Sequence, residues 1–346
     1  MTFPKKTILF VGNHLSNSDR NKGVTEDLAI HLNHAGYETI LTSSKLNKSS
    51  RLLDMLLTIL CKQRFYDISG MDLFSGPAFL WAFLSVGLLK ILRKPVIITL
   101  HGGNLPAYAE NHPHLVRRLF NWANKLVSPS SYLIEQMKQY RPDIQLIPNA
   151  IDINLYLYRQ RQKALPNLIW LRAFHEIYNP SLAVRMAEIL KQAGIGFQIR
   201  MVGPDKGDGS YQRVLALVEE KGLGEVFQFP GGVKKEKVPE ELNLGDIFLN
   251  TTNVDNTPIS VMEAMASGLC IVSTNVGGIP FLLEDGVDAL LVPPDDPQAM
   301  ADAIRRIMSE PGLAGKLSAN ARRKAESFDW SVVLPQWEAL FDKKSL

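Results

Sequence analysis

The apolar residues of this chain fall into short strand-like runs that alternate with segments of helical spacing. In the first half, the predicted strands are 7–11, 38–41, 67–69, 95–100, 125–128 and 145–147. In the second half, they are 167–171, 197–202, 227–229, 246–249, 270–273 and 290–292. Strands that alternate with helices are typical of parallel sheets covered on both faces. The pattern therefore predicts two doubly wound α/β domains.

The segments between these strands predict helices at 24–35, 115–122, 180–193, 211–221, 260–266 and 298–309, with a last amphipathic helix over 334–340. The longest apolar stretch, 78–89, is shorter than the roughly 20 residues that cross a bilayer, so we expect a buried or interfacial helix there. Segment 156–166 shows neither the apolar alternation of a strand nor the spacing of a helix, and it is interpreted as a linker. We therefore expect an N-terminal domain over 1–156, a C-terminal domain over 157–327, and a tail over 328–346.

Composition agrees with a folded protein of two domains. The chain has 346 residues, of which 46% are hydrophobic and 21% charged, and this length exceeds what one core usually supports. The net charge of +3 hides an asymmetry. Residues 1–150 hold 17 basic and 10 acidic residues (+7), which leaves 38 − 17 = 21 basic and 35 − 10 = 25 acidic residues (−4) for the rest. This asymmetry suggests different partners for the two halves.

Two further features concern the compartment. The apolar run that starts at Ile8 is too short for the hydrophobic core of a signal peptide, so it is interpreted as a first strand and the protein as cytoplasmic. The two cysteines, Cys61 and Cys270, are expected to be buried thiols in a reducing compartment.

Several kinds of site lack their sequence motif. The chain has no Walker loop, no Gly-x-Gly-x-x-Gly and no Asp-x-Asp. His112 and His114 lack further ligands at a usual spacing, so we expect a polar loop there and no metal site. No feature indicates binding of nucleic acid.

The chemistry is concentrated in segment 255–278, DNTPISVMEAMASGLCIVSTNVGG. A polar loop ends at Pro258 and enters a helix at Ile259, and the amides at a helix N-terminus suit an anion such as a diphosphate. Glu263 lies one turn further on among apolar neighbours, where a carboxylate needs partners. Gly277 and Gly278 follow the next strand, where the backbone could approach a ligand closely.

This segment resembles the signature of the retaining glycosyltransferases of family 4, which have the GT-B fold. The family pattern is Glu-x(7)-Glu, then Ala-Met-Ala-x-Gly, a strand and Gly-Gly, and here Asp255 and Glu263 stand at the two acidic positions. The likeness extends over almost the whole chain, through the motifs at 100–103 (LHGG), 148–152 (PNAID), 202–204 (VGP), 231–233 (GGV) and 328–330 (FDW). It implies two Rossmann-like domains facing across a cleft, with a C-terminal helix that crosses back to the N-terminal domain.

The resemblance also implies roles for individual residues. Glu263 would hold the ribose hydroxyls, Asp255 and His101 would contact the donor sugar, and Arg172 would stabilise the leaving diphosphate. These four residues are the predicted catalytic residues. The predicted donor-binding residues are Gly23, Tyr178, Gly203, Val233, Thr257, Pro258, Ile259, Ser260 and Val261. Among them, Gly23 would allow close approach to the diphosphate, and Val233 would meet the base through its backbone.

Two positions depart from the family pattern. Asp255 is one methylene shorter than the usual Glu, so contacts to the sugar there must be rearranged or relayed by water. Tyr178 stands where the family usually has Lys, so a neutral group replaces a cation near the diphosphate. Either Arg172 and the helix N-terminus suffice, or His175, Tyr178 and Asn179 share the task.

The resemblance implies transfer of a hexose from a nucleoside diphosphate sugar to a hydroxyl of a glycan or lipid-linked glycan, with retention, without a metal or other cofactor, in surface or extracellular polysaccharide synthesis. UDP and glucose are our choices of base and sugar. The alternatives are an epimerase or a non-catalytic binding subunit. A further hypothesis is that the basic N-terminal domain contacts anionic membrane at its inner face. The candidate residues are Arg117, Arg118, Lys125, Phe79, Trp81 and Phe83, although most of these aromatic residues are expected in the core.

Overall fold

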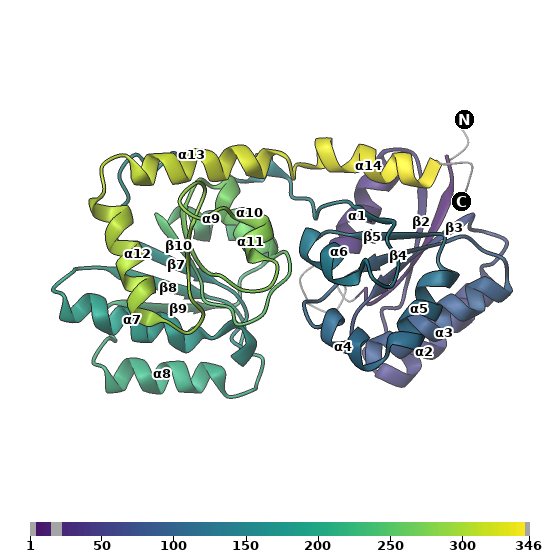
Figure 1. Ribbon diagram of the computed structural model, residues 1–346, viewed down its shortest axis with the longest axis horizontal. Coiled ribbons are helices and arrows are strands. Elements are labelled where there is room, and N and C mark those ends of the chain that lie inside the picture. The colour runs from purple at the N-terminus through teal and green to yellow at the C-terminus, as the bar shows by residue number, and fades with distance from the viewer. Residues whose placement is uncertain (1–4, 15–22, 343–346) are drawn as a thin grey trace. The chain divides into compact units, whose positions relative to one another are not determined.

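The structure is a computed structural model that describes residues 5–14 and 23–342, and it divides into two compact units. Unit 1 comprises Met1–Ala150 and Trp330–Leu346, and unit 2 comprises Ile151–Asp329. Each unit contains a six-stranded parallel sheet with helices on both faces (Figure 1). The predicted α/β class with two doubly wound sheets is confirmed. The domain boundary expected after residue 156 lies slightly further along the chain than the division between the units.

In unit 1 the strand order is β2-β1-β3-β4-β5-β6. The strands are β1 (Thr7–Val11), β2 (Glu38–Thr42), β3 (Ile68–Leu73), β4 (Val96–Leu100), β5 (Lys125–Ser128) and β6 (Ile144–Leu146). The helices are α1 (Val24–His34), α2 (Lys48–Cys61), α3 (Pro77–Ile91), α4 (Leu105–Asn111), α5 (Pro113–Trp122), α6 (Ser131–Met137) and α14 (Trp330–Asp342).

The alternation along β1 shows how this sheet is covered on both faces. Leu9 and Val11 pack in the core that α2 to α6 complete, whereas Ile8 and Phe10 pack in the core formed with α1 and α14. Successive side chains of a strand point to opposite faces, so a continuous apolar run is what a strand buried on both faces requires.

The C-terminal helix α14 belongs to unit 1 and begins at Trp330, the last residue of the FDW motif that the resemblance placed at the start of this helix. The Trp330 ring stacks on His31 of α1 with 4.0 Å between ring centroids. The Tyr37 hydroxyl donates a hydrogen bond of 2.8 Å to Asp342 at the other end of α14. Aromatic stacking at one end and a hydrogen bond at the other therefore fix the helix on this face.

In unit 2 the strand order is β12-β11-β10-β7-β8-β9. The strands are β7 (Asn167–Leu171), β8 (Gln198–Val202), β9 (Phe227–Gly231), β10 (Ile247–Asn250), β11 (Cys270–Thr274) and β12 (Leu290–Val292). The helices are α7 (Pro180–Gln192), α8 (Ser210–Glu220), α9 (Val238–Asn243), α10 (Ile259–Ala266), α11 (Ile279–Leu282), α12 (Pro297–Ser309) and α13 (Leu313–Glu326). Short 3₁₀ turns lie at η2 (Ile153–Leu155), η3 (Glu176–Tyr178) and η4 (Lys235–Lys237).

The sequence pattern missed several helices, of which α2 and α13 are the longest. Helix α13 is rich in Lys, Arg and Ala, and its buried side is made largely of small residues, so its apolar period is weak. In α2 the leucines are exposed or half-buried, whereas the buried positions hold Arg51, Met55 and Ile59, and this blurs the apolar period. Cys61 at the end of α2 is exposed, so the expectation of two buried thiols is wrong for Cys61 and confirmed for Cys270. An apolar neighbourhood in sequence is not burial when the helix face carrying it is uncovered.

The apolar stretch 78–89 lies within α3, where Phe79 and Val86 are buried in the core of unit 1. Phe79 therefore does not face a membrane, which agrees with the expectation that most of these aromatic residues lie in the core. Trp81 and Phe83 are half-buried. Among the described residues, no helix combines the length and the apolar character that crossing a membrane requires.

Candidate active site

The carboxyl ends of four parallel strands of unit 2 bring together residues that are far apart in sequence. Arg172 follows β7, Gly203 follows β8, a loop over 251–258 follows β10, and Gly277 and Gly278 come shortly after β11. Ligands of open α/β sheets bind at this edge. The predicted site residues that follow these strands thus lie at the edge of the sheet at which a ligand is expected.

Gly203 allows the backbone to pass directly beside Arg172. A Cβ at this position would lie 1.6 Å from the carbonyl oxygen of Arg172, so only glycine fits. The amide of Arg172 donates a hydrogen bond of 3.0 Å to the carbonyl of Val202. The amide of Gly203 donates one of 2.9 Å to the carbonyl of Gly231. Gly203 therefore fixes the peptide that carries Arg172, which is a structural role in addition to the predicted contact with the donor.

The Arg172 guanidinium is held between a carboxylate and an aromatic ring. One terminal nitrogen forms an ion pair with Asp255, and the guanidinium lies 4.4 Å from the centroid of the Tyr178 ring. Burial lowers the pKa of Arg172, and the nearby Tyr178 and Glu263 partly oppose that shift. Among the described residues, its buried Nε has no hydrogen-bond partner. The arrangement presents a largely desolvated cation whose hydrogen-bonding capacity is not fully used.

The loop that carries Asp255 is fixed by the two glycines after β11. The amide of Gly278 donates to the carbonyl of Asp255 at 3.0 Å. A Cβ would lie 2.3 Å from the carbonyl oxygen of Asp255 at Gly277, and 1.9 Å from that of Asn256 at Gly278. The close backbone approach expected at these glycines is therefore made to the protein's own loop, and it holds Asp255 beside Arg172.

Helix α10 starts directly after this loop, at Ile259, with Pro258 before it. The first amides of a helix lack intrahelical acceptors and carry the positive end of its dipole. Within the described part of the chain, two buried oxygens here have no partner, Asn256 Oδ1 and Ser260 Oγ. Thr257, in the same loop, is half-buried. Helix amides beside unpartnered polar groups suit a bound ligand with several oxygens.

Glu263 is 5% exposed and lies in the first two turns of α10. Its Oε1 accepts a hydrogen bond of 2.7 Å from the hydroxyl of Tyr156. The sequence indicated that this carboxylate needs a partner but not which one, because Tyr156 lies in the stretch interpreted as a linker. Val233 is half-buried and packs against the core that contains Val202 and Val261, on the same side of the sheet as α10.

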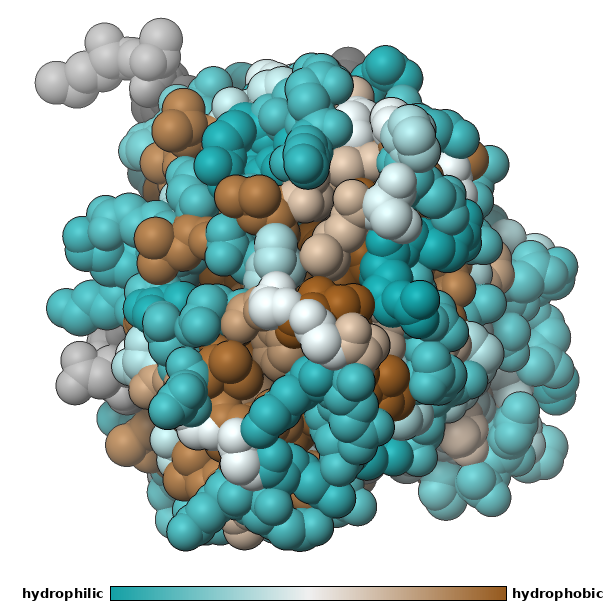
Figure 2. All heavy atoms as spheres, turned by 90° about the vertical axis from the view of Figure 1, so that its left-hand side faces the viewer, coloured by the Kyte–Doolittle hydropathy of each residue, from teal (hydrophilic) through white to brown (hydrophobic). Residues whose placement is uncertain are grey.

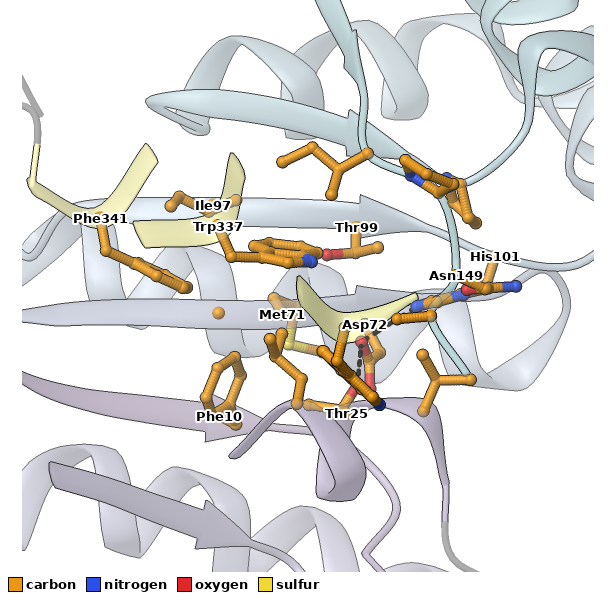
Figure 3. Close-up of a pocket in the computed structure, with 18 residues that line it drawn as sticks. Phe10, Thr25, Met71, Asp72, Ile97, Thr99, His101, Asn149, Trp337 and Phe341 are labelled. Carbon is orange, nitrogen blue, oxygen red and sulfur yellow. Dashed lines mark hydrogen bonds and ion pairs between the residues drawn. The ribbon is translucent and has the colours of Figure 1, made fainter. Parts of the chain in front are cut away.

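In unit 1, the predicted His101 belongs to a buried hydrogen-bond network. Its Nε2 lies 3.1 Å from Oδ1 of Asp72 on β3 (Figure 3). The Thr25 hydroxyl, on the first turn of α1, lies 2.9 Å and 2.8 Å from the two oxygens of Asp72. The three side chains line a cavity that also contains Trp330, Trp337 and Phe341. His101 is thus fixed by two residues that sequence reasoning missed.

Gly23 caps the start of α1 in the same region. Its amide donates a hydrogen bond of 2.6 Å to Oε2 of Glu26, a buried residue of α1. This amide is therefore already engaged within unit 1. Close by, burial lowers the pKa of His14, although Asp72 and Glu26 act in the opposite direction.

The other sequence features can be placed briefly. In residues 5–14 and 23–342, no three His, Cys, Asp or Glu side chains are grouped as a metal site would require. His112 is exposed between α4 and α5, and His114 lies in α5, so the expectation of a polar loop there is wrong. A sequence signal for Asp72 did exist, since it is an acidic residue inside a buried strand. The strand itself was predicted too short to include it.

Comparison with known proteins gives matches over most of the chain. The family profile described as "Glycosyl transferases group 1" matches residues 162–324, and the one described as "Glycosyltransferase Family 4" matches residues 67–155. A protein of Salmonella typhimurium named as the colanic acid biosynthesis glycosyltransferase WcaL is 27% identical over 231 residues, which is 62% of this chain and 55% of WcaL. The chain thus spans about half the length of the curated relatives that it matches.

Solved structures share the architecture. Sucrose-phosphate synthase from Thermosynechococcus elongatus superposes with a TM-score of 0.80 at 17% identity, over 97% of this chain and 98% of that protein. HepE from Anabaena, in a structure with UDP and glucose, superposes with a TM-score of 0.76 at 16% identity, over 97% and 99%. At these identities the likeness shows the fold, which is GT-B. The two family matches and the two six-stranded parallel sheets together show that this chain belongs to glycosyltransferase family 4.

Proposed function

We propose that the protein is a retaining hexosyltransferase that moves a hexose from a UDP-sugar to a hydroxyl of a glycan or lipid-linked glycan in polysaccharide synthesis. The observation that carries this proposal is the desolvated Arg172 at the end of β7, beside Asp255 and close to Glu263 on α10. Family membership and the naming of WcaL for colanic acid biosynthesis support it. Glucose and UDP are chosen because HepE is described with UDP-glucose.

The main demand of this reaction is to stabilise a departing diphosphate. A cation in a site of low dielectric is worth more than one in water, and preorganised amides cost nothing to orient during the reaction. In this proposal Arg172 and the first amides of α10 meet this demand. Ser260 and Asn256 have side-chain oxygens that no described residue contacts by a hydrogen bond, and these could bind hydroxyl groups of the donor. Glu263 binds the ribose hydroxyls in this proposal, and the proposal assigns no step to a metal.

Retention follows if attack and departure occur on one face of the sugar. The bond from the anomeric carbon to the diphosphate breaks, a bond to the acceptor oxygen forms, and the acceptor proton passes to the departing diphosphate. A covalent intermediate on Asp255 would need this carboxylate to be free as a nucleophile. Its ion pair with Arg172 reduces that nucleophilicity and supports the same-face scheme.

The test is a panel of nucleotide sugars, with UDP or GDP release and anomeric configuration measured with and without glycan acceptors. We expect acceptor-dependent UDP release and retention. An epimerase would convert the donor without acceptor-dependent release, and a non-catalytic subunit would bind the donor tightly without turnover. Either result would contradict the proposal.

We also propose that the protein acts at the cytoplasmic face of a membrane, through unit 1. Exposed leucines of α2 recur with helical spacing at Leu53, Leu57 and Leu60, and α3 exposes Leu80 and Leu84. Helices α2 and α3 pack against each other, and basic residues flank these leucines: Lys48, Lys62, Arg64 and Lys90. Apolar side chains with flanking basic residues suit an anionic bilayer surface. The face of unit 2 shown in Figure 2 is mainly hydrophilic, with apolar residues in between.

Sedimentation with vesicles of phosphatidylglycerol and phosphatidylcholine tests this contact. We expect binding that increases with anionic lipid, decreases with salt, and is strongly reduced by Leu53→Ser with Leu57→Ser. The matched control is Leu215→Ser with Leu244→Ser, which alters exposed leucines of unit 2. Binding that ignores lipid charge, or that both double variants reduce equally, would contradict the proposal.

A further inference from the structure

Asp72 is a half-buried carboxylate at the carboxyl edge of unit 1 to which the proposed reaction gives no role. Its side chain is 15% exposed, and that of its partner His101 is 14% exposed. It receives hydrogen bonds from His101 after β4 and from Thr25 on α1. Removing a charged carboxylate from water costs free energy unless it is hydrogen-bonded. The contacts with His101 and Thr25 offset that cost.

The charge state of Asp72 determines which nitrogen of His101 carries a proton. Burial raises the pKa of Asp72, but the hydrogen bonds that its carboxylate accepts from His101 and Thr25 act in the opposite direction, and the pKa lies below its ordinary value. The ionised carboxylate can only accept hydrogen bonds. Nε2 of His101 must then be the donor, and in the neutral imidazole this leaves Nδ1 as the acceptor nitrogen.

The surroundings hold this pair in place from other sides. The Phe74 ring stacks on His101 with 5.1 Å between centroids and an interplanar angle of 18°. A Cβ at Gly12 would lie 2.8 Å from Oδ2 of Asp72, so the glycine leaves room for the carboxylate. Elements β1, β3, β4 and α1 thus all contribute to the orientation of one imidazole ring.

We propose that Asp72, supported by Thr25, is a positioning residue that holds His101 with its Nε2–H on the carboxylate and its Nδ1 free to accept a hydrogen bond from a substrate hydroxyl. The identity of that substrate, a sugar donor or acceptor, rests on the proposed function. The orientation of His101 does not, because it is a property of unit 1 alone.

The first experiment needs no substrate. Proton–nitrogen NMR of the ¹⁵N-histidine-labelled full chain, which has seven histidines, detects each imidazole N–H, and His101→Gln assigns the signal of His101. We expect a slowly exchanging Nε2–H at His101 that disappears in Asp72→Ala and persists in Asp67→Asn. Asp67 is a matched control because it is an exposed carboxylate just before β3. A proton on Nδ1, or an unchanged Nε2–H signal in Asp72→Ala, would overturn the proposal.

The second experiment distinguishes a role of Asp72 in orienting His101 from a role in the stability of the fold alone. Asp72→Asn keeps the shape of the side chain and removes its charge. We expect kcat to fall roughly tenfold to hundredfold, as misplaced groups commonly cost, with a donor KM that changes less than about twofold. The melting temperature should fall only slightly, because the Asn amide oxygen can still accept hydrogen bonds from His101 and Thr25. Thr25→Val should show a smaller loss and Thr25→Ser almost none.

Full activity of Asp72→Asn would overturn the positioning role, and so would a loss of activity that only follows a lowered melting temperature. If the wild type transfers no sugar from any donor, the proposed function fails, but the NMR experiment still decides how His101 is oriented. The two proposals can therefore fail separately.

Discussion

The carboxyl edges of the two units are built alike from parallel strands but carry opposite central charges. In unit 2 the centre is the cation Arg172, between Asp255 and the ring of Tyr178. In unit 1 it is the anion Asp72, between His101 and Thr25. In each case the charge is largely desolvated and its partners come from several elements. This difference fits the proposed roles, in which unit 2 stabilises anionic charge and unit 1 orients a ring that binds a hydroxyl group.

The net charge of each unit is opposite to the charge at the centre of its edge. Residues 1–150 carry +7, and 330–346 add two basic and two acidic residues, so unit 1 stays at +7 and unit 2 has −4. Long-range net charge governs steering and association, whereas a buried group acts at contact distance. In the proposed function, the basic charge of unit 1 therefore concerns its partners, and the largely buried cation Arg172 of unit 2 concerns the chemistry.

The largest expected effect comes from removing that cation. Arg172→Ala should lower kcat by roughly 10² to 10³, the usual cost of removing a preorganised electrostatic stabiliser. The measurement is steady-state UDP release with acceptor. The control is Arg185→Ala, which alters a surface arginine of α7 paired with Asp295. Retention of more than half the activity by Arg172→Ala would contradict the role given to unit 2.

The next largest effect is expected at Glu263, which in the proposal binds the ribose hydroxyls of the donor and does not stabilise the departing diphosphate. Glu263→Gln keeps the shape but weakens charge-assisted hydrogen bonds, so we expect the donor KM to rise about tenfold or more. Tyr156→Phe, which leaves the carboxylate in place, should give a smaller rise. If Tyr156→Phe is as damaging as Glu263→Gln, the hydroxyl of Tyr156 itself contacts the donor.

A smaller effect tests how Tyr178 replaces the usual family lysine. Its ring faces Arg172, and a cation–π contact contributes roughly 0.5–2 kcal/mol. Tyr178→Phe keeps the ring and should retain nearly full kcat, whereas Tyr178→Leu should lose roughly two- to thirtyfold. Equal losses in both variants would show that the hydroxyl, and not the ring, is what Tyr178 contributes.

The smallest difference is expected in the labelling of the two cysteines, one on the surface of unit 1 and one in the core of unit 2. Burial raises the pKa of Cys270 to about 12, so this thiol stays protonated and unreactive at neutral pH. Cys61 is exposed at the end of α2. A thiol reagent should label one cysteine of the folded protein and two after denaturation. Labelling of Cys270 in the native protein would show that the core of unit 2 opens.

Much of the fold could be predicted because local patterns decide it. Buried parallel strands are continuous apolar runs, and for β1, β5, β7 and β12 the predicted ranges are those observed. The loop into α10 and its Glu263 could be found because a helix N-terminus and a carboxylate among apolar residues have recognisable sequences. The strand ranges failed where a polar residue stands in a strand, as Asp72 does in β3.

The sequence by itself determined the two parallel sheets, the family, and the set of residues near the strand ends of unit 2. Only the tertiary structure decided their partners: Asp255 for Arg172, Tyr156 for Glu263, and Asp72 with Thr25 for His101. Such pairs join residues 29 to 107 positions apart along the chain. The physical reason is that periodicity records which face a residue occupies, whereas a hydrogen-bond partner depends on which strand ends the fold brings together.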